Sequence, residues 1–174
     1  IRDGMVLICE DRRNKALVSS LNVKQNVVLS TIDNYASFGV ISEKKEIADT
    51  EDKIESLKIK TEGPSQPVMQ LSGGNQQKVV FAKALMSKPK VLLCDEPTQA
   101  VDVVTRSEIH KLLRKLADEG NGVLFVSSDL KEVLEVADNV QIMANGRTKE
   151  IYKNEGLTAE TVLASCYADE NKRK

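Results

Sequence analysis

Three short apolar segments, each followed directly by polar residues, constrain the fold of this chain most strongly. They are residues 5–9 (MVLIC), 91–94 (VLLC) and 123–126 (VLFV). Short, continuous apolar runs of this kind are typical of strands that are buried on both faces of a parallel sheet. Helical patterns separate the three runs. We therefore expect an α/β fold in which helices cover a mostly parallel sheet.

The residues that follow these strands are candidates for chemistry, because ligands of parallel sheets bind at the carboxyl ends of the strands. A first carboxylate at such an end can hold a hydrated magnesium ion, and a second can orient a water for attack on a phosphoryl group. A buried strand that ends in an acidic turn is also common without any function. The three polar pairs are Glu10-Asp11, Asp95-Glu96 and Ser127-Ser128.

Caps and apolar spacing predict the helices. The pattern Asn22-Val-Lys-Gln25 resembles a capping box, and so does Thr105-Arg-Ser-Glu108. The dipeptide Asn145-Gly146 predicts a hairpin between strands 139–144 and 147–152. The expected helices cover 22–35, a charged segment 42–57, 79–87, a segment that begins at Thr105, a segment capped by Asp129, and 158–167.

Composition excludes several classes of protein. The chain has 174 residues, a net charge of −1, 3% aromatic residues and no Trp. The near-zero net charge and the scarcity of aromatic side chains argue against nucleic-acid binding. No apolar run approaches the roughly 18 residues that a membrane-spanning helix needs. Cys9, Cys94 and Cys166 are expected to be buried free thiols in a reducing cytosol rather than disulfide partners or zinc ligands. His110, the one histidine, is expected on the surface or at the rim of a helix.

Residues 71–78 (LSGGNQQK) carry the most specific pattern. Two glycines before a helix allow backbone N–H groups to approach a ligand, and a helix amino end attracts anions. The alternative is a serine cap with a flexible Gly-Gly lead-in. That alternative is plausible for Ser-Gly-Gly alone, but much less so for the whole octapeptide placed one helix before a strand that ends in DEPT.

Residues 71–78, residues 92–98 (LLCDEPT) and Val101-Asp102 together resemble the ATPase subunits of ABC transporters. Asn75, Glu10-Asp-Arg12 and Ser127-Ser128 narrow the resemblance to the second ATPase domain of the fused, two-domain subunits that power bacterial simple-sugar importers. The resemblance covers nearly the whole chain. It implies a P-loop NTPase-like fold with an incomplete ATPase core at 1–30 and 90–174 and a helical signature subdomain at 31–89.

The resemblance also implies catalytic and metal-binding roles. Asp95 would be the magnesium-side aspartate of the Walker B strand, and Glu96 would polarise the attacking water. Ser128 would take the place of the catalytic switch histidine, although a hydroxyl cannot act as an imidazole contact to the γ-phosphate. Glu10 would take the place of the glutamine that senses magnesium and the transmembrane partner, with an added charge.

Other positions would contact ATP bound by a partner ATPase domain. Asp102 would lie in the D-loop and act across the dimer, although Gln99-Ala100 and Val104 differ from the usual D-loop residues. The residues of the signature loop that would contact the nucleotide are Ser72, Gly73, Gly74 and Gln76.

A nucleotide-binding P-loop reads GxxxxGK[ST], and the dipeptide Gly-Lys occurs nowhere in this sequence. The chain begins with Ile1 rather than Met, so we expect the carboxyl-terminal part of one ATPase domain. We expect the isolated chain to be inactive. In the family the P-loop strand lies between strands 123–126 and 139–144. Its absence would expose two strand edges and favour strand-mediated or swapped dimers.

The first functional hypothesis is a part of an ATP-hydrolysing, energy-coupling subunit of an ABC importer for sugars. It implies ATP and Mg²⁺ as cofactors, a second ATPase domain and membrane-spanning permease subunits as partners, and a cytoplasmic position on the inner face of the cell membrane. One alternative is a regulatory or structural partner of an ABC ATPase that has no P-loop and no activity. Another is an ABC ATPase that works in repair or translation, although the long insertions usual there are not visible.

Overall fold

The computed structural model describes residues 4–37, 40–144 and 146–167. Its contacts divide the chain into two compact units, Ile1–Leu124 and Phe125–Lys174. The expected helical subdomain, residues 31–89, lies inside the first unit, and its boundaries stay a prediction. Among the helices of the described ranges, none is both long enough and apolar enough to cross a membrane.

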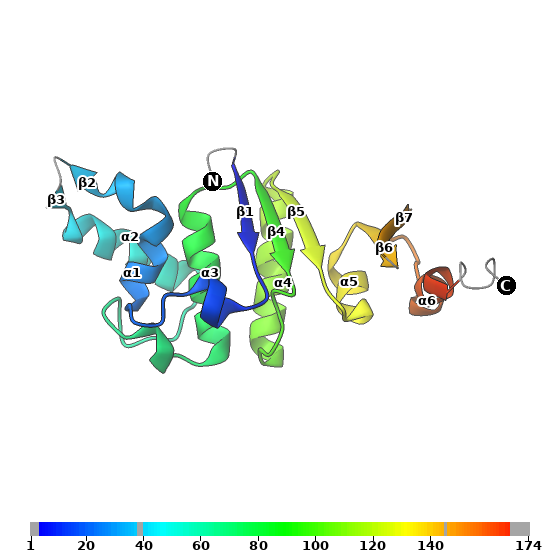
Figure 1. Cartoon of the computed structure of the whole chain (residues 1–174), viewed down its shortest axis with the longest axis horizontal. Coiled ribbons are helices and arrows are strands. Elements are labelled where there is room, and N and C mark those ends of the chain that lie inside the picture. The colour runs from blue at the N-terminus through cyan, green and yellow to red at the C-terminus, as the bar shows by residue number, and fades with distance from the viewer. Residues whose placement is uncertain (1–3, 38–39, 145, 168–174) are drawn as a thin grey trace. The chain divides into compact units, whose positions relative to one another are not determined.

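The three apolar runs form one sheet, as predicted. Strands β1 (Met5–Ile8), β4 (Val91–Asp95) and β5 (Gly122–Val126) lie in the order β1-β4-β5. Their arrows point the same way in Figure 1. Strands β1 and β4 pair in parallel, in a register that runs from Met5 opposite Val91 to Ile8 opposite Cys94. The polar residues after β1 and β4 therefore leave the sheet at the same edge.

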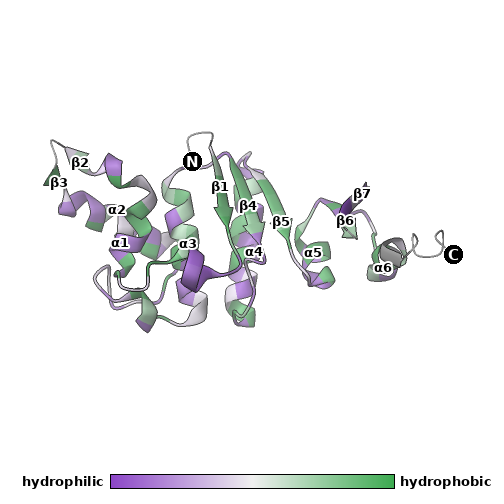
Figure 2. Cartoon of the chain, viewed as in Figure 1, coloured by the Kyte–Doolittle hydropathy of each residue, from purple (hydrophilic) through white to green (hydrophobic). Residues whose placement is uncertain are grey.

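The expectation that these strands are buried on both faces is wrong. Side chains alternate along a strand, and the face that includes Ile8, Leu92 and Cys94 is buried at 0–1% exposure. The opposite face is open, with Met5 48% and Leu7 61% exposed. Figure 2 colours all three strands as hydrophobic. The apolar runs therefore reflect a sheet with two apolar faces, only one of which is covered within the described residues.

Helices of the first unit cover the buried face of the sheet and pack on one another. Helix α3 packs against β1, α4 and α1, and α1 packs against α2. The capping box at Asn22 is confirmed, since its side chain accepts from Gln25 N. The α-helix ends sooner than expected, at Val28. A 3₁₀ segment follows, and Thr31 (φ −130°, ψ 24°) kinks it. The helical elements are η1 (Arg12–Ala16), α1 (Val23–Val28), η2 (Leu29–Asn34), α2 (Glu43–Ser56), η3 (Val68–Gln70), α3 (Gly73–Met86) and α4 (Val103–Asp118).

The charged segment 42–57 forms α2, as expected, and a short hairpin of β2 (Ala36–Ser37) and β3 (Val40–Ile41) precedes it. Polar groups contribute to its attachment. Lys24 Nζ contacts Glu43 Oε1 at 2.8 Å and Glu46 Oε2 at 3.6 Å, and Tyr35 Oη donates to Asp49 at 2.9 Å. Lys24 and Glu46 are each 8% exposed. The helix is therefore less solvated than its composition indicates.

His110 is buried at 6% exposure, so its expected place on the surface or at the rim is wrong. The buried stripe of α4 contains Ile109 and Leu113, as the spacing predicts, but it is wide enough to include the neighbouring residue 110. Cys94 is buried at 1% exposure, as expected, whereas Cys9 is only half-buried. The side chain of Cys166 lies outside the described residues.

The second unit contains α5 and a two-stranded antiparallel sheet followed by α6. The hairpin at Gly146 is confirmed (φ +73°), and Asn145 lies outside the described residues. Asp129 caps α5 as expected, accepting from Lys131 N and Glu132 N. The elements are α5 (Leu130–Val136), β6 (Asn139–Ala144), β7 (Arg147–Lys153) and α6 (Ala159–Tyr167).

Candidate functional site

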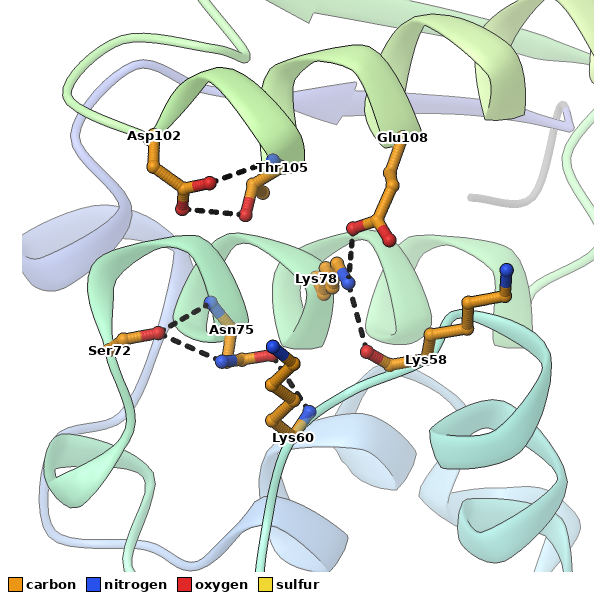
Figure 3. Close-up of polar contacts among 8 residues, drawn as sticks. All are labelled: Lys58, Lys60, Ser72, Asn75, Lys78, Asp102, Thr105 and Glu108. Atoms are coloured by element: carbon orange, nitrogen blue, oxygen red, sulfur yellow. Dashed lines mark hydrogen bonds and ion pairs between the residues drawn. The ribbon is translucent and has the colours of Figure 1, made fainter.

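The amino end of α3 is built by Ser72 and Asn75. The helix begins at Gly73, six residues before the expected start, because Ser72 caps it and both glycines take helical positions in its first turn. Ser72 Oγ accepts from Asn75 N at 3.4 Å and from Asn75 Nδ2 at 2.8 Å (Figure 3). Asn75 Oδ1 in turn accepts from Lys60 N at 2.8 Å. The serine cap is confirmed. It leaves the hydroxyl proton of Ser72 to be donated, so the anion site at 71–78 stays a prediction that the cap does not oppose.

The first turn of α3 suits an anion. It contains no acidic side chain, and its backbone N–H groups and helix dipole favour negative charge. Ser72 is exposed, while Gly73 is half-buried and Gly74 is buried. Any anion bound here would contact the hydroxyl and the first amides rather than a side-chain cation of the same turn.

The amino end of α4 is capped by Asp102, and not by Thr105 as the sequence pattern predicts. Asp102 Oδ1 accepts from Thr105 N at 3.0 Å, and Oδ2 accepts from Thr105 Oγ1 at 2.8 Å (Figure 3). These hydrogen bonds from Thr105 hold the pKa of Asp102 below its ordinary value. Asp102 is itself a favoured cap residue, and it lies three residues before Thr105. Because its side chain accepts from a helix amide one turn earlier, the helix starts there and Thr105 becomes part of its first turn.

The two helix ends touch at Gly74. A Cβ added there would lie 2.5 Å from Thr105 Oγ1 and 3.0 Å from Asp102 Oδ2. Such distances leave no room for any side chain at residue 74. The segment that begins at Ser72 and the segment that begins at Asp102 therefore form one corner of the molecule, although about 30 residues separate them in the sequence.

The acidic residues lie at the ends of neighbouring strands. Glu10 and Glu96 each lie two residues beyond the last paired residues of the two strands, Ile8 and Cys94. Glu10 and Asp95 are exposed, and Glu96 has a left-handed backbone (φ +46°). No group of three or more potential metal ligands occurs among the residues that the structure describes. A cation at this edge would therefore need oxygen ligands from a bound phosphate or from water.

Residues 4–99 match the family model described as "ABC transporter". The chain belongs to the ABC transporter family. It is 42% identical to the xylose import ATP-binding protein XylG of Pseudomonas fluorescens, over 95% of the chain and 32% of that protein. It is 39% identical to the ribose import ATP-binding protein RbsA of Geobacillus kaustophilus, over 94% of the chain and 33% of that protein. The chain thus spans about a third of the length of these relatives.

Solved ABC structures have the same fold. An ATP-binding cassette determined as a dimer with ADP and Pi superposes with a TM-score of 0.74 and 26% identity, over 90% of this chain and 65% of that one. A second dimeric cassette gives a TM-score of 0.75 at 25% identity, with the same coverage. The predicted α/β ABC ATPase fold is confirmed, and so is the resemblance to ATP-binding proteins of sugar import.

Two further residues of the predicted site are Gln76 and Ser128. Gln76 is 1% exposed and donates from Nε2 to Leu71 O at 3.0 Å, while its Oε1 has no partner among the described residues. Ser128 belongs to the second unit and is exposed. Its neighbour Ser127 donates to Glu132 Oε2 at 2.8 Å and so helps to fix the start of α5.

Two cations near the predicted site residues have contacts that the sequence does not predict. Lys78, in the second turn of α3, is buried and contacts Lys58 O at 2.9 Å and Glu108 Oε2 at 2.7 Å (Figure 3). Arg12 donates to the carbonyls of Gln99 and Ala100. No local pattern could reveal these pairs, since the partners are between 20 and 88 residues apart.

Proposed function

We propose that this chain is part of an ATP-hydrolysing, energy-coupling subunit of an ABC importer for sugars. The observation that carries the proposal is the corner in which the first turn of α3 meets the cap of α4 at Gly74. The loop that leads to this cap follows β4, whose last residue is Asp95. The proposal draws further support from relatives named as xylose and ribose import ATP-binding proteins.

Within this proposal the residues at the end of β4 act in one catalytic site. Asp95 is exposed at the last position of the strand and would hold Mg²⁺ through water or directly. Glu96 would orient the attacking water, and Glu10, on the neighbouring strand end, would be close enough to sense the ion. Ser128 would offer one hydrogen bond to the γ-phosphate.

The corner at α3 acts on a nucleotide held by a second ATPase domain. Ser72 keeps its hydroxyl proton for donation, because its Oγ is the acceptor in both of its hydrogen bonds with Asn75. Gly73 and Gly74 would present backbone amides to the γ-phosphate. Asp102 would contribute through the geometry of its loop, since its own carboxylate is engaged by Thr105. Gln76 would support the loop from behind rather than contact ATP, because it is buried.

The open side of the sheet is where we propose that the P-loop part of the ATPase packs. Met5 and Leu7 on the open face of β1 are 48% and 61% exposed, and Leu124 of β5 is 58% exposed. Exposed apolar surface of this kind marks an interface. Strand β5 is an edge strand among the described residues, and so can accept a further strand. The assembled subunit would work with a second ATPase domain and with permease subunits, on the cytoplasmic face of the membrane.

Nucleotide binding and hydrolysis test this proposal. We expect the 174-residue chain alone to show no tight MgATP binding in calorimetry and no hydrolysis, because no Gly-Lys of a P-loop occurs in it. The intact protein that contains it should hydrolyse ATP. There, Glu96→Gln should lower kcat by about 10²-fold or more, and the exposed Glu155→Gln should not change it.

Two results would overturn the proposal. A micromolar Kd for MgATP with the isolated chain would show that the nucleotide site is already complete in it. An intact protein that neither binds nor hydrolyses ATP would instead favour a regulatory or structural partner of an ABC ATPase.

We further propose that the isolated chain self-associates through β5. Light scattering should give a dimer mass that dissociates on dilution. Leu124→Lys should abolish the dimer, since a lysine on an edge strand opposes pairing. Ile151→Lys, at an exposed position of β7, should leave the dimer intact. A monomer at all concentrations would contradict this part of the proposal.

A further inference from the structure

Arg12 reaches from the segment after β1 to the loop between β4 and α4. It is the first residue of η1, two residues after Glu10. Its Nη1 donates to Gln99 O at 3.1 Å, and its Nη2 donates to Ala100 O at 3.5 Å. The fork of a guanidinium suits two acceptors held in one plane. A single side chain thus fixes two successive carbonyls that lie 87 and 88 residues further along the chain.

The loop that Arg12 holds is strained. Glu96 and Ala100 both have positive φ angles, +46° and +53°. Non-glycine residues adopt this left-handed region at a cost in free energy, so the surrounding structure must maintain it. The loop has a backbone hydrogen bond of its own, from Gln99 N to Glu96 O at 3.1 Å. Arg12 adds two hydrogen bonds from outside the loop.

The guanidinium also lies against the first turn of α3. A Cβ added at Gly73 would be 2.9 Å from Arg12 Nη2 and 3.5 Å from Ala100 O. Arg12 therefore contacts the loop on one side and faces a residue without a side chain on the other. Its Nε is buried with no partner among the described residues.

We infer that Arg12 is a positioning residue that sets loop 96–102 against the first turn of α3. It links three segments that the proposed function uses: the strand end at Glu10, the loop that follows Glu96, and the turn that begins at Ser72. The clamp itself rests on the geometry above. Its consequence for hydrolysis rests on the proposed function, because Glu96 and the α3 turn must be held in register for ATP to react.

Hydrogen exchange on the 174-residue chain tests the clamp. The amide of Gln99, which donates to Glu96 O inside the loop, reports on the loop. Losing the two hydrogen bonds from Arg12 should speed exchange of this amide by about tenfold in Arg12→Ala. Arg12→Lys should give a similar change, because an ammonium lacks the fork. The exposed neighbour Arg13 provides the matched control, and Arg13→Ala should leave exchange of the Gln99 amide unchanged. Exchange in β1 should stay the same in all variants, which shows that the chain remains folded.

ATP hydrolysis by the intact protein tests the consequence. We expect Arg12→Lys to lower kcat by about tenfold or more while KM for MgATP changes less than about twofold, because ground-state binding does not require the loop geometry. Arg12→Lys also retains the positive charge, so a purely electrostatic role would leave kcat unchanged.

The outcomes separate the clamp itself, its effect on hydrolysis and the proposed function. Unchanged exchange of the Gln99 amide in Arg12→Ala, or an equal change in Arg13→Ala, would overturn the clamp. Faster exchange with a normal kcat in Arg12→Lys would show that the clamp exists but does not position the reaction. An intact parent protein without ATPase activity would refute the proposed function and leave the exchange result standing.

Discussion

The contact at Gly74 gives the sharpest prediction about this molecule, because two opposing effects of one substitution can be compared. In Gly74→Ala the new Cβ would lie 2.5 Å from Thr105 Oγ1 and 3.1 Å from Thr105 Cβ. Ordinary contacts of this kind are 3.4–4 Å, so Thr105 or α3 must move by about 1 Å. Thr105 is 8% exposed and its hydroxyl is bonded to Asp102, and both facts resist that movement.

The expected magnitude follows from these terms. Alanine in place of glycine stabilises a helix by about 0.8–1 kcal/mol, whereas forcing a methyl group into a packed contact costs about 1–3 kcal/mol. We expect a net destabilisation of about 1 kcal/mol, which for a chain of this size lowers Tm by about 3 °C. Circular dichroism during thermal unfolding measures it. Gly74→Ala should also lower ATPase activity in the intact protein, since it separates the two helix ends.

The double variant Gly74→Ala with Thr105→Ala is the control. Removing the hydroxyl removes the 2.5 Å contact, so the penalty of Gly74→Ala should be smaller by about 1 kcal/mol in the Thr105→Ala background. Two outcomes would refute the reasoning. One is a Gly74→Ala variant that is more stable than the parent, as helix propensity alone requires. The other is an equal penalty in both backgrounds.

Three further predictions concern side chains whose environment the structure defines. Burial raises the pKa of the Cys94 thiol to about 12. Maleimide should therefore label Cys9 at least about tenfold faster than Cys94 when the folded chain is labelled and its peptides are mapped. Equal labelling rates would contradict the fold around β4. Hydrogen bonds from Thr105 hold the pKa of Asp102 below its ordinary value of 3.8. The charged cap is therefore fully stabilising above about pH 4, and its stabilisation is lost as the pH falls through the lowered pKa. The Tm difference between the parent and Asp102→Ala should shrink over that pH range, and a constant difference would exclude the charged cap. Glu108→Gln breaks the ion pair with Lys78 and should destabilise the chain by about 1–2 kcal/mol in urea unfolding. This is less than the loss of a fully buried ion pair would cost, because Glu108 is 36% exposed. Adding Lys78→Met to Glu108→Gln should restore part of the lost stability, and no recovery would show that the two residues are not coupled.

Much of this molecule follows from short-range sequence patterns. The strands, the cap at Asn22, the hairpin at Gly146 and the polar strand ends follow from local spacing and turn chemistry, which act over a few residues. Residues 71–78 predicted an anion-binding helix start for the same reason. Local rules were less accurate where two patterns overlap, as at the start of α4, where Asp102 caps the helix instead of Thr105.

Tertiary structure decided which side chains are covered and which distant segments meet. The apolar runs predicted strands but could not show that Met5 and Leu7 are exposed. The pattern of residues along a strand does not say which other segments pack on each face of the sheet. The burial of His110, the ion pair of Lys78 and the clamp made by Arg12 all depend on residues far apart in the chain. The sequence by itself determined the elements and their chemistry; the three-dimensional fold decided their contacts, because packing is a property of surfaces that no local pattern contains.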